Sequence, residues 1–240
     1  MDKTIEISHL RKTFKGGVTA LNDVSLVIDE GELFGLLGVN GAGKTTLVKI
    51  LCCLTRPTEG TATVCGHDVV TDAQEVKQII DLSPQETSVA PNLTVRENLE
   101  FFAQIYDKNT PEHVQNVMDT FSLGEVADRR ADKLSGGWKR RLSIAVALIS
   151  EPQVLFLDEP TLGLDVLARR ELWKIIERLK GKITIVLTSH YLEEIEALCD
   201  RVSVLSDGKL LATGTTEELI KQTGANNFED AFVSIVEAAQ

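Results

Sequence analysis

The fold of this chain is decided by one short stretch, Gly38-Val39-Asn40-Gly41-Ala42-Gly43-Lys44-Thr45. It fits the pattern G-x-x-x-x-G-K-[ST], and it lies between the apolar run 33–37 and the amphipathic segment 46–54. Glycines let such a loop turn its backbone N–H groups inward around phosphates, and the helix that follows adds partial positive charge. The stretch therefore predicts a strand, a phosphate-binding loop and a helix, in that order.

Two side chains of this loop, the Walker A loop or P-loop, have chemistry of their own. Lys44 can reach the β- and γ-phosphates of a nucleotide, and the Thr45 hydroxyl can ligate Mg²⁺. A P-loop alone does not separate kinases, GTPases and ATPases. The residues predicted to contact the nucleotide here are Gly38, Val39, Asn40, Gly41, Ala42, Gly43, Lys44, Thr45 and Thr46.

A second apolar run, 154–157, ends in two carboxylates, Asp158 and Glu159, which Pro160 follows. This is the Walker B pattern. Asp158, at the carboxyl end of the strand, is expected to hold Mg²⁺, directly or through water. Glu159 is then placed to polarise a water molecule for attack on the γ-phosphate. The alternative, an ordinary exit from a strand into a loop, is disfavoured by the P-loop upstream.

The remaining pattern predicts an α/β protein with a mostly parallel central sheet. Short continuous apolar runs suit parallel strands covered on both faces, whereas alternation in the first thirty residues predicts an antiparallel β subdomain. Thr94 and Glu97 form a capping box, and Thr110-Pro111 predicts a second helix start, so a helical subdomain interrupts the core. We expect one domain over 1–240, with the helical subdomain at about 86–133 and a C-terminal extension at about 214–240.

Composition narrows the class of protein. The chain has 240 residues and a formal net charge of −11, which disfavours a nucleic-acid partner. The basic run 139–141 is interpreted as a solvated helix face. No apolar stretch approaches the roughly 18–20 residues of a membrane span, and the four cysteines include no C-x-x-C pair. These features predict a cytoplasmic protein with reduced cysteines.

Five further segments resemble the nucleotide-binding subunits of ABC transporters. Leu134-Ser135-Gly136-Gly137-Trp138 is similar to the LSGGQ signature, and it precedes the Walker B strand, as in the family. Trp138 departs from the family pattern at the glutamine, which affects the contacts expected near the ribose. The other matching positions are Gln85 of the Q-loop, Gly163-Leu164-Asp165 of the D-loop, the switch residue His190, and Phe14 at the adenine-stacking position.

The resemblance implies a P-loop NTPase fold and a role for each matching residue. Gln85 and His190 would join Glu159 as catalytic residues, and Gln85 would share Mg²⁺ with Thr45 and Asp158. Phe14 would stack on adenine. Two copies would close head-to-tail around two ATP molecules, each copy contacting the ATP of the other. The residues implied in that second contact are Ser135, Gly136, Gly137 and Asp165.

The implied function is ATP hydrolysis that drives a separate transmembrane permease from the cytoplasmic face of the membrane. Segments 94–106 and 229–232 look most like export subunits. A non-transport ABC-type ATPase acting on DNA or ribosomes is the alternative. It is disfavoured because 45–134 holds no sustained heptad pattern and the chain has no C-x-x-C pair. A GTPase or a small-molecule kinase is disfavoured for two reasons. The sequence has no N-K-x-D motif, which reads guanine, and the segment Ser135–Gly137 and His190 would have no explanation.

Overall fold

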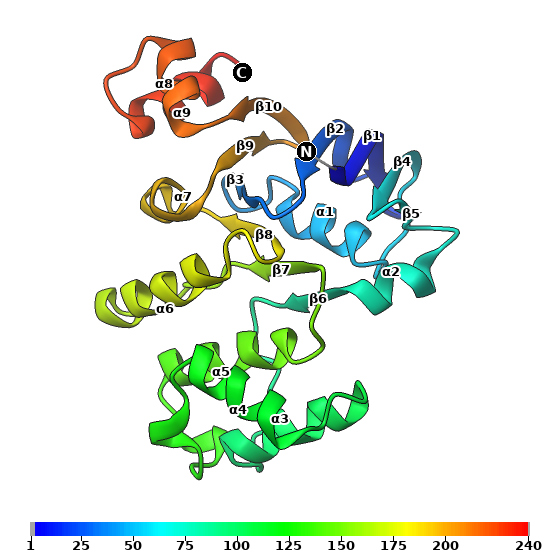
Figure 1. Ribbon diagram of the computed structural model, residues 1–240. Helices are drawn as coiled ribbons and strands as arrows, with labels where there is room; N and C mark the ends of the chain where they lie inside the picture. The colour runs from blue at the N-terminus through cyan, green and yellow to red at the C-terminus, as the bar shows by residue number, and fades with distance from the viewer. Residues whose placement is uncertain (1–2, 240) are drawn as a thin grey trace.

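The computed structural model describes residues 3–239, which form two sheets flanked by helices (Figure 1). The smaller sheet is antiparallel, in the order β2-β1-β4-β5, and consists of β1 (Lys3–Thr13), β2 (Thr19–Asp29), β4 (Glu59–Val64) and β5 (His67–Asp68). The larger sheet has the order β10-β9-β3-β8-β7-β6. It consists of β3 (Leu33–Leu37), β6 (Ile80–Ser83), β7 (Val154–Asp158), β8 (Thr184–Ser189), β9 (Arg201–Ser206) and β10 (Lys209–Gly214).

The larger sheet is parallel except at one edge. Strands β6, β7, β8, β3 and β9 are parallel, whereas β10 returns antiparallel to β9. The hairpin turns at Asp207 and Gly208, both of which have positive φ, as the two-residue turns that match strand twist require. The predicted fold class, a mostly parallel sheet with an N-terminal antiparallel subdomain, is confirmed.

Nine α-helices and two 3₁₀ turns complete the described part of the chain. They are α1 (Lys44–Leu51), α2 (Ala73–Ile79), α3 (Val95–Ile105), α4 (Pro111–Thr120), α5 (Gly136–Leu148), α6 (Val166–Leu179), α7 (Leu192–Leu198), α8 (Thr216–Thr223), α9 (Phe228–Glu237), η1 (Gly124–Val126) and η2 (Ala131–Lys133). Thr94 and Glu97 form the predicted capping box of α3, and Thr110 caps α4. Helices α3 and α4 project from the sheets at the end opposite α8 and α9 (Figure 1).

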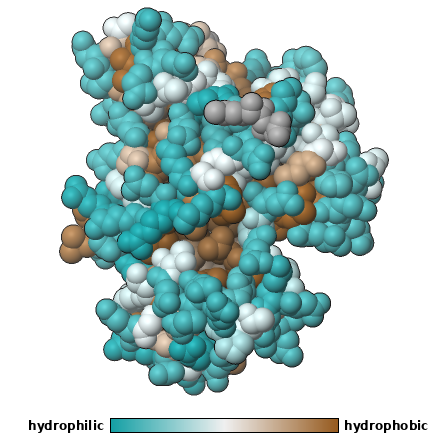
Figure 2. Space-filling model, viewed as in Figure 1, coloured by the Kyte–Doolittle hydropathy of each residue, from teal (hydrophilic) through white to brown (hydrophobic). Residues whose placement is uncertain are grey.

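The large sheet separates two hydrophobic cores. Leu33 and Leu37 of β3 face the core shared with α5, α6 and the helical subdomain, whereas Phe34 and Leu36 face the core under α1 and the antiparallel sheet. Strands covered on both faces need apolar residues at every position, which explains their continuous runs. Figure 2 shows a mainly polar surface, with apolar residues gathered in the hollow between the helical subdomain and the sheets.

Three parallel strands bring their carboxyl ends to one edge of the sheet. Leu37 of β3 is in register with Ser189 of β8, and Thr188 of β8 is in register with Asp158 of β7. The P-loop, the two carboxylates and His190 therefore leave the sheet side by side, at the edge where open α/β sheets bind ligands. Across residues 3–239, no helix combines the length and the apolar character needed to cross a bilayer.

Candidate active site

The P-loop wraps around the ammonium group of its own lysine. Lys44 is 6% exposed, and its Nζ donates to the carbonyls of Gly38 at 2.6 Å and Val39 at 3.4 Å. Two glycines are required by close approach. A Cβ on Gly38 would lie 2.3 Å from the Leu205 carbonyl oxygen, and one on Gly43 (φ +110°) would lie 2.5 Å from that of Ala20. The loop is thus shaped as the sequence pattern predicts.

The Asp158 carboxylate lies between two threonine hydroxyls. Oγ1 of Thr45 is 3.2 Å from Oδ2 of Asp158, and Oγ1 of Thr188 donates to Oδ1 at 2.6 Å. Thr188 also accepts, at 3.0 Å, the hydrogen bond donated by the backbone N–H of Glu159. No sequence motif assigns a role to Thr188, which lies two positions before His190. Its contact with both carboxylate residues follows from the pairing of β7 with β8.

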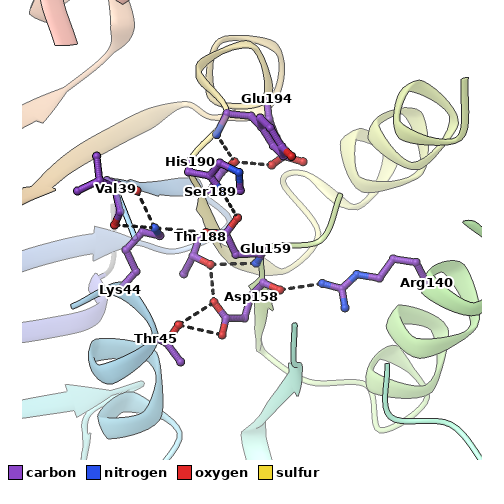
Figure 3. A network of polar contacts seen from close by, with 12 residues as sticks. Val39, Lys44, Thr45, Arg140, Asp158, Glu159, Thr188, Ser189, His190 and Glu194 are labelled. Carbon is purple, nitrogen blue, oxygen red and sulfur yellow. Dashed lines mark hydrogen bonds and ion pairs between the residues drawn. The ribbon is translucent and has the colours of Figure 1, made fainter. Parts of the chain in front are cut away.

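The Glu159 carboxylate joins two other predicted site residues (Figure 3). Its Oε1 is 3.2 Å from Nζ of Lys44, and its Oε2 is 2.5 Å from Nδ1 of His190. The Glu159 side chain is 8% exposed, so these contacts are shielded from solvent. Glu159 itself has φ +49°, a left-handed conformation that is uncommon for residues other than glycine. Such strain persists where the surrounding structure fixes the backbone.

A cavity of about 400 Å³ opens beside these groups. Its wall at the start of α1 is suited to a charged ligand, because the helix N-terminus presents unpaired N–H groups there. Phe14 does not line this cavity; it is 43% exposed, with Nζ of Lys12 5.1 Å from its ring centroid. The predicted residues that line the cavity are Asn40, Gly41, Ala42, Gly43, Lys44, Thr45, Thr46, Gln85, Glu159 and His190.

The signature segment lies apart from this cavity. Ser135 occupies the N-cap position of α5, yet within residues 3–239 its side chain makes no capping hydrogen bond. A Cβ on Gly137 would lie 3.1 Å from Cβ of Ala168, so the segment packs on the start of α6. Asp165 caps α6 by accepting from the N–H groups of Leu167 and Ala168. The structure therefore does not bring Ser135 and Asp165 to the cavity of their own chain.

One expectation about charge is wrong. Arg140 does not belong to a solvated helix face, because it is 4% exposed and its guanidinium faces the carboxyl end of β7. Burial lowers the pKa of the Arg140 guanidinium to about 10, and the neighbouring carboxylates of Asp158, Glu194 and Glu159 oppose that shift. Arg140 therefore stays protonated at neutral pH. Its spacing with Ile144 and Ala147, both buried, is the sequence signal that could have placed it inside.

Glu194, on α7, is a second buried charged residue that the sequence analysis missed. It accepts hydrogen bonds from Oγ of Ser189 at 2.7 Å and from Nε1 of Trp173 at 3.1 Å. Burial raises the pKa of the Glu194 carboxyl, and these hydrogen bonds oppose the rise. Oγ of Ser189 also accepts the hydrogen bond of the Tyr191 N–H. Glu194 thus holds the Ser189 hydroxyl, which in turn holds the backbone N–H that follows His190.

Comparison with known proteins places these residues in a wider context. A family model described as ABC transporter matches residues 21–162, a range that includes the P-loop, the signature segment and both carboxylates. The doxorubicin resistance ATP-binding protein DrrA of Mycobacterium tuberculosis is 40% identical over 98% of this chain and 71% of its own length. Nod factor export ATP-binding protein I of Burkholderia lata is 40% identical over 90% of this chain and 72% of its own.

Solved structures include a comparable protein. A dimeric ATP-binding cassette in a post-hydrolysis state, bound to ADP and Pi, superposes with a TM-score of 0.77. It is 26% identical in sequence, and the match covers 88% of this chain and 98% of that one.

Proposed function

Because this chain belongs to the ATP-binding subunits of ABC transporters, which hydrolyse ATP to drive transport, we propose that two copies close around two ATP molecules and drive a separate transmembrane partner. The Glu159 carboxylate carries this proposal. It lies between Lys44 and His190, beside the cavity that the P-loop lines. This is the position of a general base for water that attacks a phosphate held by the P-loop.

Binding of ATP uses the groups of the P-loop. The phosphates give Lys44 a partner of higher charge than Glu159, and the N–H groups at the start of α1 stabilise the same anion. Thr45 and Asp158 fit Mg²⁺, because hydroxyl and carboxylate oxygens are the donors this ion prefers and here they lie 3.2 Å apart. When bound, Mg²⁺ would neutralise part of the phosphate charge, and Gln85, which lines the cavity, would lie near the ion.

Hydrolysis then depends on Glu159 and His190. Once Lys44 contacts the phosphates, the Glu159 carboxylate accepts a proton from the attacking water, while the bond from the γ-phosphorus to the ADP oxygen breaks. His190 holds Oε2 of Glu159 through Nδ1, which orients the carboxylate. The base is thereby fixed before the substrate arrives, so little reorganisation remains for the reaction step.

A second copy supplies the groups that the cavity lacks. Ser135, Gly136, Gly137 and Asp165 do not line the cavity of their own chain. The uncapped hydroxyl of Ser135 and the N–H groups at the start of α5 suit an anion presented from outside. We therefore place them on the ATP of the partner copy, and the dimeric state of the ADP-bound relative supports this arrangement. Phe14 does not line the cavity and is exposed, which leaves its ring free to stack on adenine, the role that the family resemblance gives it.

The membrane partner is a permease, and the direction of transport is export. Relatives that cover most of this chain are named for doxorubicin resistance and for Nod factor export. The Gln85 loop joins the cavity to the helical subdomain, so the subdomain and this loop form the docking surface at the cytoplasmic face of the membrane. The loss of the γ-phosphate would be sensed at Gln85 and passed to that surface.

The test is Glu159→Gln, with the exposed Glu177→Gln on α6 as the matched control. A carboxamide cannot accept the proton, so turnover of Mg-ATP should fall by about 10²–10⁴-fold, while ATP binding stays. Size-exclusion chromatography should then show a dimer that forms with Mg-ATP and dissociates slowly. The control should retain wild-type turnover. If Glu159→Gln hydrolyses ATP at the wild-type rate, the assignment of the base is wrong.

A further inference from the structure

Arg140 is held by four backbone carbonyls that belong to two segments of the site. Nε donates to the Pro160 carbonyl at 2.7 Å, and Nη2 donates to that of Asp158 at 2.8 Å. Nη1 donates to the carbonyls of Pro84 at 2.5 Å and Gln85 at 3.3 Å. One guanidinium therefore connects the end of β7 to the Q-loop. Within residues 3–239, Arg140 forms no direct ion pair, and its hydrogen bonds go to these four carbonyls.

The two contacts at and just after the end of β7 lie on either side of Glu159. The carbonyls of Asp158 and Pro160 are the ones immediately before and after this residue, and Arg140 holds both. The Glu159 N–H is held from the opposite side by Thr188. The left-handed backbone of Glu159, with φ +49°, is thus fixed by hydrogen bonds on every side. That backbone sets where the Glu159 side chain starts, and the contacts of its carboxylate with Lys44 and His190 fix the direction in which it ends.

Arginine suits this task better than any other residue. Its planar guanidinium presents five N–H donors in a fixed fork, so it can hold carbonyls on both sides at once. A lysine ammonium is a single point on a flexible stem, and it can satisfy one of the two segments at a time. The carboxylates of Asp158, Glu194 and Glu159 lie near enough to favour the charged form, but the hydrogen bonds of the guanidinium go to carbonyl oxygens.

We propose that Arg140 is a positioning residue for ATP hydrolysis, which holds the Glu159 carboxylate in its reactive direction and joins it to the Gln85 loop. This inference rests on the proposed role of Glu159 as the general base. Arg140 does not line the nucleotide cavity, so it acts on the rate of the chemical step and not on ATP binding. Because the same guanidinium bonds both segments, movement of the Gln85 loop would change the hydrogen bonds that hold the backbone around Glu159.

The test compares Arg140→Gln and Arg140→Lys with Arg178→Gln, an exposed arginine at the end of α6 that serves as the control. Steady-state hydrolysis of Mg-ATP should show kcat lowered by about 10–100-fold in both Arg140 variants, the range expected for a misplaced catalytic group. KM and the ATP affinity by nucleotide titration should be unchanged, and the control should match wild type. Circular dichroism melts establish that each variant is folded at the assay temperature.

A double-mutant cycle separates positioning from general support. If Arg140 acts through Glu159, then Arg140→Gln in the Glu159→Gln background should leave the residual hydrolysis within about twofold of Glu159→Gln alone. A further drop as large as in the wild-type background contradicts the inference. So does an unchanged kcat in both single variants, a loss of ATP affinity equal to the loss of kcat, or the failure of both to fold. Wild-type turnover by Glu159→Gln alone instead refutes the base, whatever Arg140 does.

Discussion

Thr188→Val should lower the rate of ATP hydrolysis, although Thr188 does not line the cavity itself. Thr188 is fully buried on β8, and valine has nearly its shape, so the change removes one hydroxyl and leaves the packing intact. That hydroxyl donates to Asp158 at 2.6 Å and accepts from the Glu159 N–H at 3.0 Å. Both carboxylate residues therefore lose one support at once.

The cost in stability follows from these two bonds. A hydrogen bond to a carboxylate contributes about 1.5–3 kcal/mol, more than one between neutral groups. The Glu159 N–H keeps its contact with the Thr188 carbonyl at 3.2 Å, so its loss is small. We expect the free energy of unfolding to fall by about 2–3 kcal/mol. For a chain of this length that lowers Tm by about 5–10 °C.

Thermal unfolding by circular dichroism and steady-state hydrolysis of Mg-ATP measure the two effects. Thr184→Val is the matched control: Thr184 is equally buried at the opposite end of β8, where its hydroxyl contacts Gly31 and Thr4. It should lower Tm and leave kcat at the wild-type value below the transition. Thr188→Val should lower both. Equal kcat in the two variants would refute the reasoning, because the hydroxyl would then contribute to stability and not to the site.

Two further changes test the nucleotide site and its coupling. Phe14→Ala should weaken the binding of ATP and of GTP alike, by about 1–3 kcal/mol, the scale of base stacking on aromatic side chains in nucleic-acid sites. Nucleotide titration measures both affinities, with the exposed Phe101→Ala as control. A loss confined to ATP would contradict simple stacking. Gln85→Ala should leave the affinity for ATP unchanged but uncouple cargo transport from ATP hydrolysis. Both rates are measured in proteoliposomes, with the exposed Gln222→Ala as control. Transport at an unchanged ratio of ATP hydrolysed to cargo moved would exclude the switch role.

Residues that act through local chain geometry could be predicted from the sequence. The P-loop needs glycines at Gly38 and Gly43 because neighbouring carbonyls leave no room for a Cβ, and that requirement is written in the motif itself. The capping box at Thr94 and Glu97 is equally local. The apolar run of β7 ends at its carboxylates because the strand ends there. Each of these features depends on residues within a few positions of one another.

Arg140, Thr188 and Glu194 act across the fold, and their roles depend on strand pairing and helix placement. By their spacing, Leu142, Ala145, Val146 and Ile149 of helix α5 lie on one apolar face. Every residue from Leu142 to Ala147 is buried, so the helix is covered on more than one face and Arg140 enters the interior with it. The spacing of Arg140 with Ile144 and Ala147 could place it inside, but what it holds there can be recognised only when the carbonyls opposite it are known. Those carbonyls come from segments about twenty and fifty-five residues away.

Helix α5 connects the two halves of the proposed dimeric site. Its N-cap residue is Ser135, the proposed contact to the ATP of the partner copy. Arg140 follows within two turns and holds the backbone around Glu159. A rigid helix transmits a displacement of its N-terminus to a side chain so near it. ATP bound by the partner copy would therefore act on the base of this copy through Arg140, and hydrolysis would depend on closure of the dimer even though every catalytic group but the signature lies in one chain.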